Sequence, residues 1–145
     1  MKTFSKNITS LADNKIFVFG SNTEGRHGKG AALTAKKRFG AIYGQPKGRQ
    51  GNSYAIITKD LTKADQLRSV SLEEIEIQVD IFIEYARVNP KLTFYVVKFG
   101  SSLAGFADIE ISRMFNGKDL PDNIIMNEDY AINICDSRLD YFNEE

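Results

Sequence analysis

The chain has 145 residues, of which 42% are apolar and 26% charged, so its composition is that of a globular protein rather than a collagen-like, coiled-coil or disordered one. Nineteen lysines and arginines balance nineteen acidic residues, and this balance excludes recruitment of nucleic acid or membranes by overall charge. A single cysteine and a single histidine exclude an internal disulfide and a zinc site of about four such ligands. We expect one domain over residues 1–145 and neither metal nor cofactor.

The first predicted element is a strand over residues 15–19, an apolar and β-branched run typical of a strand buried on both faces. It ends at Gly20, and a glycine-rich loop follows as far as Gly30. Residues 31–39 then favour a helix closed by Gly40. This order of strand, glycine loop and helix is the first unit of the predicted fold.

A second glycine-rich connection, residues 40–51, leads into a strand predicted at residues 54–58. Ser71 and Glu74 have the spacing of a capping box, so a helix should begin there and end at Pro90. The most apolar strand is predicted at residues 92–99, followed by a loop over residues 100–106 and a short helix over residues 108–115. Two further strands are predicted at residues 124–126 and 131–135.

Alternating strands and helices predict an α/β fold with a mixed, largely parallel central sheet. Ligands of such sheets bind beyond the carboxyl ends of the strands, where the two glycine loops should lie. Eight of the eleven glycines fall between Gly20 and Gly51. Because exposed backbone amides bind anionic oxygens, the two loops together indicate a ligand that contains a diphosphate. The alternative is that the glycines only permit tight turns and close packing.

Several side chains near these loops have both a structural and a functional interpretation. His27 is either a solvated or capping loop residue or a ligand contact. Lys59, just past a strand, is either a solvated lysine or, if partly desolvated, a nucleophile. Residues 36–38 should form the solvated face of the first helix, and Cys135 should be a small core residue. The glycine spacing matches neither the dinucleotide-binding fingerprint nor the P-loop, which excludes a Rossmann dehydrogenase and a P-loop kinase.

The order of these loops resembles the macrodomain, an ADP-ribose-binding module with a three-layer α/β/α fold. Within that family the chain is most similar to the terminal ADP-ribose glycohydrolase subgroup, which includes antitoxins of DNA-ADP-ribosylating toxins. Residues 28–40, 54–59 and 100–106 carry the likeness, which extends over residues 6–115. The segment from Phe19 to Ala32 also resembles small bacterial and T4-like phage proteins. The resemblance and the absence of a membrane-length apolar run imply a cytoplasmic protein, in the host cytoplasm if phage-encoded.

The resemblance also implies a set of site residues. Lys59 matches the catalytic lysine, which attacks the anomeric carbon of the distal ribose. The position of the catalytic aspartate holds Ala104, and Asp108 is the nearest substitute. The position of the acidic residue that contacts adenine holds Asn7. Phe106 should stack near the ribose. The implied ligand-binding residues are Asn7, Gly20, Ser21, Asn22, Arg26, His27, Gly28, Lys29, Gly30, Gly100, Ser101, Ser102, Leu103, Ala104, Gly105 and Phe106.

These observations lead to two functional hypotheses. The first is binding of ADP-ribose or a related nucleotide, free or attached to a macromolecule, with hydrolysis of ADP-ribosyl linkages through Lys59 as a further activity. The alternative is an interaction protein that keeps a macrodomain-like fold without the chemistry, which Ala104 favours.

Overall fold

A computed structural model describes residues 1–101 and 104–134 of the chain. In these ranges the chain forms six strands, four α-helices and one 3-10 helix. In chain order they are β1 (Lys2–Phe4), β2 (Lys15–Asn22), α1 (Gly30–Arg38), β3 (Gly48–Gln50), β4 (Ser53–Lys59), α2 (Leu72–Val88), β5 (Thr93–Val96), α3 (Asp108–Ser112), η1 (Arg113–Phe115), β6 (Ile124–Asn127) and α4 (Glu128–Ala131).

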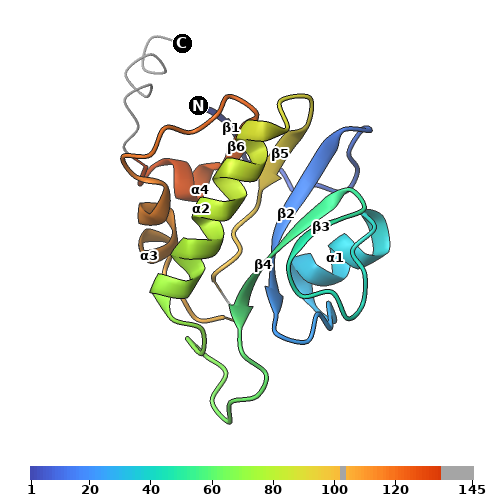
Figure 1. The fold of residues 1–145 in the computed structure, drawn as a ribbon, viewed down its shortest axis with the longest axis vertical. Helices are drawn as coiled ribbons and strands as arrows, with labels where there is room; N and C mark the ends of the chain where they lie inside the picture. Colours follow the sequence, from blue (N-terminus) through green and yellow to red (C-terminus); the bar gives the residue numbers. More distant parts are fainter. Residues whose placement is uncertain (102–103, 135–145) are drawn as a thin grey trace.

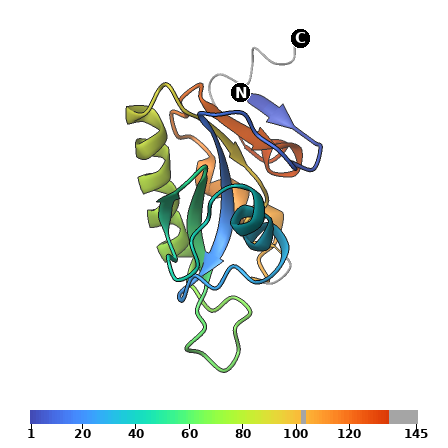
Figure 2. The ribbon, with the colours of Figure 1, turned by 90° about the vertical axis from the view of Figure 1, so that its right-hand side faces the viewer.

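The strands form one mixed sheet in the order β1-β6-β5-β2-β4-β3. All neighbouring strands run parallel except β3, which is antiparallel to β4. Helix α1 covers one face of the sheet and α2 the other (Figures 1 and 2). The predicted α/β class and the mixed, largely parallel sheet are therefore confirmed.

Strand β2 lies near the middle of the sheet, between β4 and β5. Its residues from Ile16 to Phe19 are all buried, because α1 covers one face of the strand and α2 the other. This burial confirms the prediction made from the apolar run. None of the described helices has the length and apolar character that crossing a bilayer requires.

Helix α2 packs against the sheet through a stripe of apolar residues that includes Ile75, Val79 and Phe82, all fully buried. The Ser71 side chain accepts a hydrogen bond of 3.1 Å from the Glu74 amide, which caps the helix at the predicted position. The helix ends at Val88, two residues before Pro90, as expected for a residue that cannot continue a helix.

Helix α1 is attached to the opposite face by a smaller apolar cluster. Phe39, just after the helix, stacks on Phe17 of β2 at 4.7 Å between ring centroids. The end of α1 packs closely on the turn between β3 and β4, since a Cβ on Gly51 would lie 2.8 Å from the Cα of Gly40. Residues 36–38 are exposed, as predicted.

The end of β5 differs from the prediction. The strand covers only Thr93–Val96, whereas the apolar run extends to Phe99. The amides of Phe99 and Gly100 leave the sheet and donate to the Tyr130 hydroxyl at 3.1 and 3.2 Å. The helix predicted at residues 108–115 is present as α3 followed by η1.

The strand predicted at residues 131–135 is wrong over the described residues 131–134. Ala131 ends α4, and residues 132 and 133 form a turn. The Asn127 side chain accepts a hydrogen bond of 2.9 Å from the Tyr130 amide, so a helical turn begins directly after β6. Cys135 lies outside the described residues. The strand predicted at residues 124–126 is confirmed as β6, whereas the short edge strands β1 and β3 were not predicted.

The connections of the strands create a switch point at β2. The chain leaves β2 through α1 on one face of the sheet, but it leaves the neighbouring β4 through α2 on the other face (Figure 2). Helices that depart in opposite directions leave a crevice at the carboxyl ends of the strands between them, which is where ligands of open α/β sheets bind.

Candidate functional site

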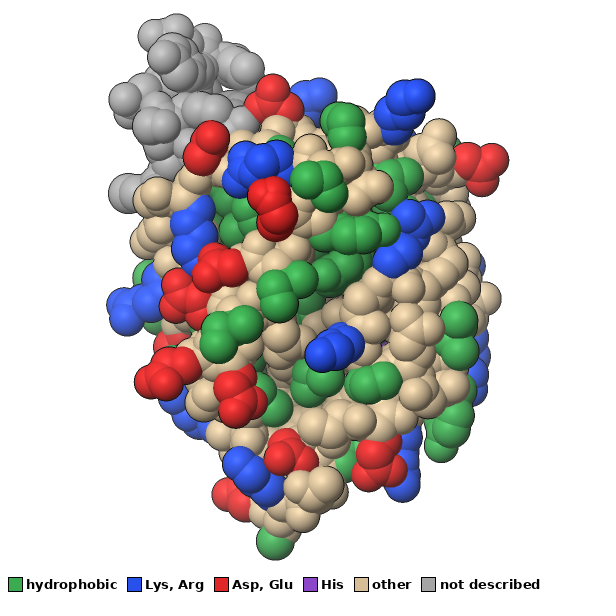
Figure 3. Space-filling view, viewed as in Figure 1, with side chains coloured by type: hydrophobic (Ala, Val, Ile, Leu, Met, Phe, Trp, Pro, Cys, Tyr) green, Lys and Arg blue, Asp and Glu red, His purple; other side chains and the backbone are tan. Residues whose placement is uncertain are grey.

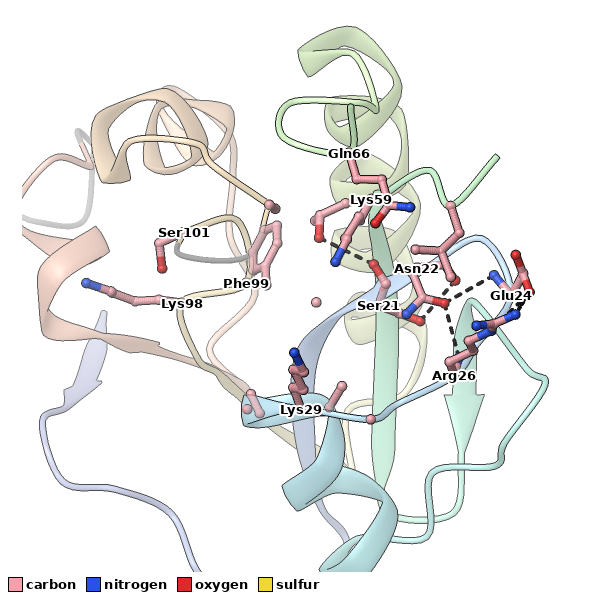
Figure 4. A pocket seen from close by; sticks show the side chains of 18 residues that line it. Ser21, Asn22, Glu24, Arg26, Lys29, Lys59, Gln66, Lys98, Phe99 and Ser101 are labelled. Atoms are coloured by element: carbon pink, nitrogen blue, oxygen red, sulfur yellow. Dashed lines mark hydrogen bonds and ion pairs between the residues drawn. The ribbon is translucent and has the colours of Figure 1, made fainter. Parts of the chain in front are cut away.

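A cavity of about 500 Å³ lies at this switch point (Figure 4). Its wall is built from the carboxyl ends of β2 and β4, the start of α1, the segment after β5 and the loop between β4 and α2. The lining residues are Gly20, Ser21, Asn22, Glu24, Arg26, Gly28, Lys29, Gly30, Ala31, Ala32, Thr58, Lys59, Leu61, Gln66, Lys98, Phe99, Ser101 and Ala104. The structure thus brings together many of the residues expected at the site.

The N-terminus of α1 opens onto the cavity. The first amides of a helix have no partner within it, and the N-cap residue of α1, Lys29, provides no side-chain cap. The first turn also holds no acidic residue. A Cβ on Gly30 would meet no atom within 4 Å, so the backbone here faces open space. These amides, at the positive end of the helix dipole, are available to an anion.

Two ammonium groups face the same space. Lys29 and Lys59 point into the cavity from opposite sides in Figure 4. Neither forms an ion pair with a residue that the structure describes. Lys59 is half-buried at the end of β4, whereas Lys29 is exposed. A ligand with two negative charges would therefore meet two cations that form no ion pair within the described part of the chain.

The other cations of the wall already have anionic partners. Arg26 pairs with Glu24 at 2.8 Å, and both side chains lie at the rim. Lys98 pairs with Asp129 at 3.1 Å and Asp108 at 3.2 Å, and these hydrogen bonds raise the Lys98 pKa. Figure 4 shows Lys98 directed away from the middle of the cavity.

The loop between β2 and α1 is shaped by its own backbone. The Asn22 side chain accepts hydrogen bonds from the amides of Glu24 and Arg26 at 3.2 and 3.1 Å. Gly25 has a φ of 62°, and a Cβ there would lie 2.7 Å from the Gln45 backbone. Asn22 and Gly25 therefore hold the loop in the conformation that exposes residues 28–30 to the cavity.

Gly20 has a packing role at the floor of the cavity. A Cβ on Gly20 would collide with the carbonyl oxygen of Phe99 and lie 3.2 Å from Thr58 Oγ1. The absence of a side chain lets β2 approach the segment after β5. At Gly20, which lines the cavity, the backbones of the two segments therefore lie against each other.

His27 belongs to the loop between β2 and α1, but it does not line the cavity. The side chain is fully buried, with its ring edge on Phe19 at 5.3 Å between centroids. Its Nε2 atom lies 3.2 Å from the Gln45 carbonyl oxygen and 3.1 Å from Gln50 Oε1. Its Nδ1 atom has no hydrogen-bond partner in the described part of the chain. The buried His27 ring therefore attaches the loop to Gln45, Gln50 and Phe19.

The loop expected around residues 100–106 contributes less than the first. Ser101 and Ala104 line the cavity, but Gly100, Gly105 and Phe106 do not. Phe106 is 4% exposed and packs under the Arg68 guanidinium, 4.9 Å from its ring centroid, instead of facing a ligand. Ser102 and Leu103 lie outside the described residues.

Asp108 and Asn7 lie outside the cavity wall. Asp108 is engaged by Lys98, as described above. Asn7 is exposed and lines a neighbouring groove of about 630 Å³ on the far side of the start of α1. The two hollows share Ala31 and Lys98, so they adjoin.

Several lining residues did not emerge from the sequence. Lys98 and Phe99 lie two and three residues after β5, and their position just before a glycine loop could have indicated them. Thr58 precedes Lys59 at the end of β4 and could have been found in the same way. Leu61 and Gln66 come from an irregular loop whose path the sequence does not indicate.

The chemistry of the cavity has to be inferred from its own residues. No family model matches the chain, and neither the curated proteins nor the solved structures give a significant match. Among the residues with described positions, no group of three or more His, Cys, Asp or Glu side chains is arranged to hold a metal ion. For an anionic ligand, the wall offers the first amides of α1 and two ammonium groups, Lys29 and Lys59, that form no ion pair with a described residue. Its one described carboxylate, Glu24, is paired at the rim.

Proposed function

We propose that this protein binds ADP-ribose or a closely related nucleotide, with the diphosphate at the N-terminus of α1 between Lys29 and Lys59. The observation that carries the proposal is the convergence of free helix amides and two unpaired ammonium groups on one cavity at the switch point. Its volume of about 500 Å³ is within the range of roughly 300 to 1,000 Å³ typical of small-molecule sites.

The neighbouring groove supports a ligand longer than a diphosphate. It adjoins the cavity at Ala31 and Lys98, so one elongated molecule can occupy both. In our proposal the adenine lies near Asn7, whose carboxamide can both donate and accept hydrogen bonds. The distal ribose then lies near Asn22 and Lys59. A macrodomain-like α/β/α fold is part of the same proposal, and the mixed sheet with helices on both faces agrees with it.

Calorimetric titration with ADP-ribose tests the proposal. We expect binding that is weakened roughly 10- to 100-fold by Lys59→Ala or by Lys29→Ala, because each substitution removes a charge-assisted hydrogen bond worth roughly 1.5 to 3 kcal/mol. Lys47→Ala is the matched control, since this exposed lysine does not line the cavity. Absence of both heat and thermal stabilisation at millimolar ADP-ribose would contradict the proposal.

Binding without hydrolysis is the form of the proposal that the wall favours. In hydrolysis through Lys59, the ammonium would first lose a proton, and the neutral amine would attack the anomeric carbon while the bond to the leaving group breaks. The leaving group would need a proton, and water would then release ADP-ribose from the lysine adduct. Among the described lining residues, Glu24 has the one carboxyl group that could supply this proton, and it is exposed and paired with Arg26. Ala104, which lines the cavity, provides no acid.

The hydrolytic alternative is separable by experiment. We expect the protein to bind an ADP-ribosylated protein or oligonucleotide and to release no ADP-ribose above the rate of a sample without enzyme. Release that is fast in the parent and abolished by Lys59→Ala would instead establish hydrolysis through that lysine. Release at equal rates in both would exclude Lys59 as the nucleophile.

A further inference from the structure

The zero net charge of the chain hides a strong separation of charge. Residues 1–59 contain eleven lysines and arginines and two acidic residues, whereas residues 60–145 contain eight and seventeen. No acidic residue occurs between Gly25 and Lys59. In Figure 3 the acidic side chains gather over α2 and α3 on the left, and few lie on the right, where α1 is.

The two halves also differ in how their cations are used. Beyond residue 59, four basic residues form ion pairs with nearby carboxylates: Arg68, Arg87, Lys98 and Lys118. Lys36 and Lys37 in the last turn of α1, and Lys47 and Arg49 in the chain that follows, form no ion pair with any residue the structure describes. All four side chains are exposed.

An exposed aromatic ring lies among these cations. Tyr43 is 61% exposed, and the Lys36 ammonium lies 5.2 Å from the centroid of its ring. We call Lys36, Lys37, Tyr43 and Lys47 the basic face; Arg49 is not part of it, because its guanidinium lies 3.5 Å from the Tyr85 hydroxyl of α2, on the other face of the sheet. None of the four lines the cavity, so their charges do not serve the nucleotide site.

We propose that the basic face binds single-stranded nucleic acid. Unpaired cations on a surface attract phosphates through the release of counterions. An exposed ring beside them offers a platform on which one unstacked base can lie, a combination typical of single-strand binding. A duplex, whose bases are stacked and paired, would use the cations alone and leave Tyr43 without a role. The proposal does not depend on ADP-ribose binding.

Fluorescence anisotropy with a labelled single-stranded DNA of about 20 nucleotides tests the cations. We expect binding that weakens as salt rises from about 50 to 200 mM. The double variant Lys36→Gln/Lys37→Gln should weaken it by roughly tenfold at low salt and reduce the slope of log K against log salt by about 1.4, which is about 0.7 per phosphate contact. The control Lys91→Gln/Arg113→Gln removes two exposed cations elsewhere and should change neither quantity.

Substitutions at Tyr43 test the base platform. Tyr43→Leu keeps an apolar side chain and removes the ring, and it should weaken binding by about fivefold or more without changing the salt slope. Tyr43→Phe keeps the ring and should restore the parent affinity. Saturating ADP-ribose should leave oligonucleotide binding unchanged, which separates this proposal from that of the cavity.

Four results would overturn the proposal. The first is an absence of binding at low salt, and the second is an equal loss in the control double variant. The third is heparin binding as tight as that of the oligonucleotide together with no effect of Tyr43→Leu, which would make the basic face a general polyanion surface. The last is self-association that Lys36→Gln/Lys37→Gln abolishes, which would assign the basic face to the acidic half of a second copy.

Discussion

Two glycine-containing loops lie at the carboxyl edge of the sheet, one before α1 and one after β5. They differ in the hydrogen-bond partners of their backbone amides. In the loop before α1, the amides at residues 30–32 begin a helix and face the cavity. In the segment after β5, the amides of Phe99 and Gly100 donate to the Tyr130 hydroxyl. Further along, the Ala107 amide donates to the Glu110 carboxylate at 3.0 Å. The amides at the start of α1 therefore remain available to a ligand. The amides of Phe99, Gly100 and Ala107 are already bonded to side chains of the protein.

This difference shows that glycine alone does not identify an anion-binding loop. A Cβ on Gly28 would lie 3.9 Å from its nearest neighbour, the Arg26 carbonyl oxygen, so this residue leaves room for a ligand. A Cβ on Gly100 would lie 2.5 Å from the Ile111 side chain, so that residue leaves room for the core. Glycine therefore leaves space for a ligand in the loop before α1, whereas it allows close packing against Ile111 in the segment after β5.

The largest expected effect comes from breaking the internal bonds of the second loop. Tyr130 is fully buried, and burial raises the pKa of its phenol, so the hydroxyl stays neutral. Tyr130→Phe would leave two buried amides without an acceptor and should lower the free energy of unfolding by about 3 kcal/mol. Denaturant unfolding measures this change.

Tyr85→Phe is the control for that experiment. Its hydroxyl accepts one long contact of 3.5 Å from Arg49, so the free energy of unfolding should change by less than about 0.5 kcal/mol. If Tyr130→Phe were equally mild, the amides of the second loop would not depend on this hydroxyl, and the contrast between the loops would be lost.

A pair of alanine substitutions separates access from packing. Gly100→Ala should lower the free energy of unfolding by about 2 kcal/mol, because the new methyl group overpacks against Ile111. Gly28→Ala should change it by less than about 0.5 kcal/mol. In calorimetry, Gly28→Ala should nevertheless weaken ADP-ribose binding severalfold, because its methyl group occupies the cavity. If Gly28→Ala lost stability and kept its affinity for ADP-ribose, Gly28 would be a packing residue and would not provide space for the ligand.

The smallest expected effect concerns the start of α3. The bidentate contact with Arg68 and the Ala107 amide lower the Glu110 pKa from 4.5 to about 2. Because the pKa is lowered in the folded state, ionised Glu110 stabilises the protein above about pH 5, and this contribution is lost as the pH falls toward 2. Glu110→Gln should slightly lower the melting temperature at pH 7, and the difference should shrink on acidification.

The Arg68→Gln background provides the control for this pH dependence. Since Arg68 is the main cause of the lowered pKa, adding Glu110→Gln there should shift the melting temperature by a smaller amount that varies less with pH. An unchanged pH dependence in that background would mean that Arg68 is not responsible.

The central elements of the fold were predictable because their patterns are long. The run ending at Gly20 predicted β2, and the Ser71 cap with Pro90 bounded α2. Edge strands β1 and β3 have three residues each, too few to show a periodicity. At residues 131–134 alternating apolar residues resembled a strand, but the Asn127 cap overrides this pattern locally.

The site was predictable where a residue type and its place at a strand end coincide, as for Lys59 and residues 28–30. Sequence could not reveal that Phe106 packs into the core or that Lys98 is held by two carboxylates, because both depend on contacts between distant segments. It also could not place Gln66 on the wall, since the loop between β4 and α2 has no regular pattern.

His27 gives the protein a built-in spectroscopic probe. It is the only histidine in the chain, and it is a buried residue of the loop that opens onto the cavity. Its imidazole is shielded from solvent and touches Gln45, Gln50 and Phe19. Its ring resonances can therefore be observed without overlap from another histidine, and they will report any displacement of the loop when a ligand is added.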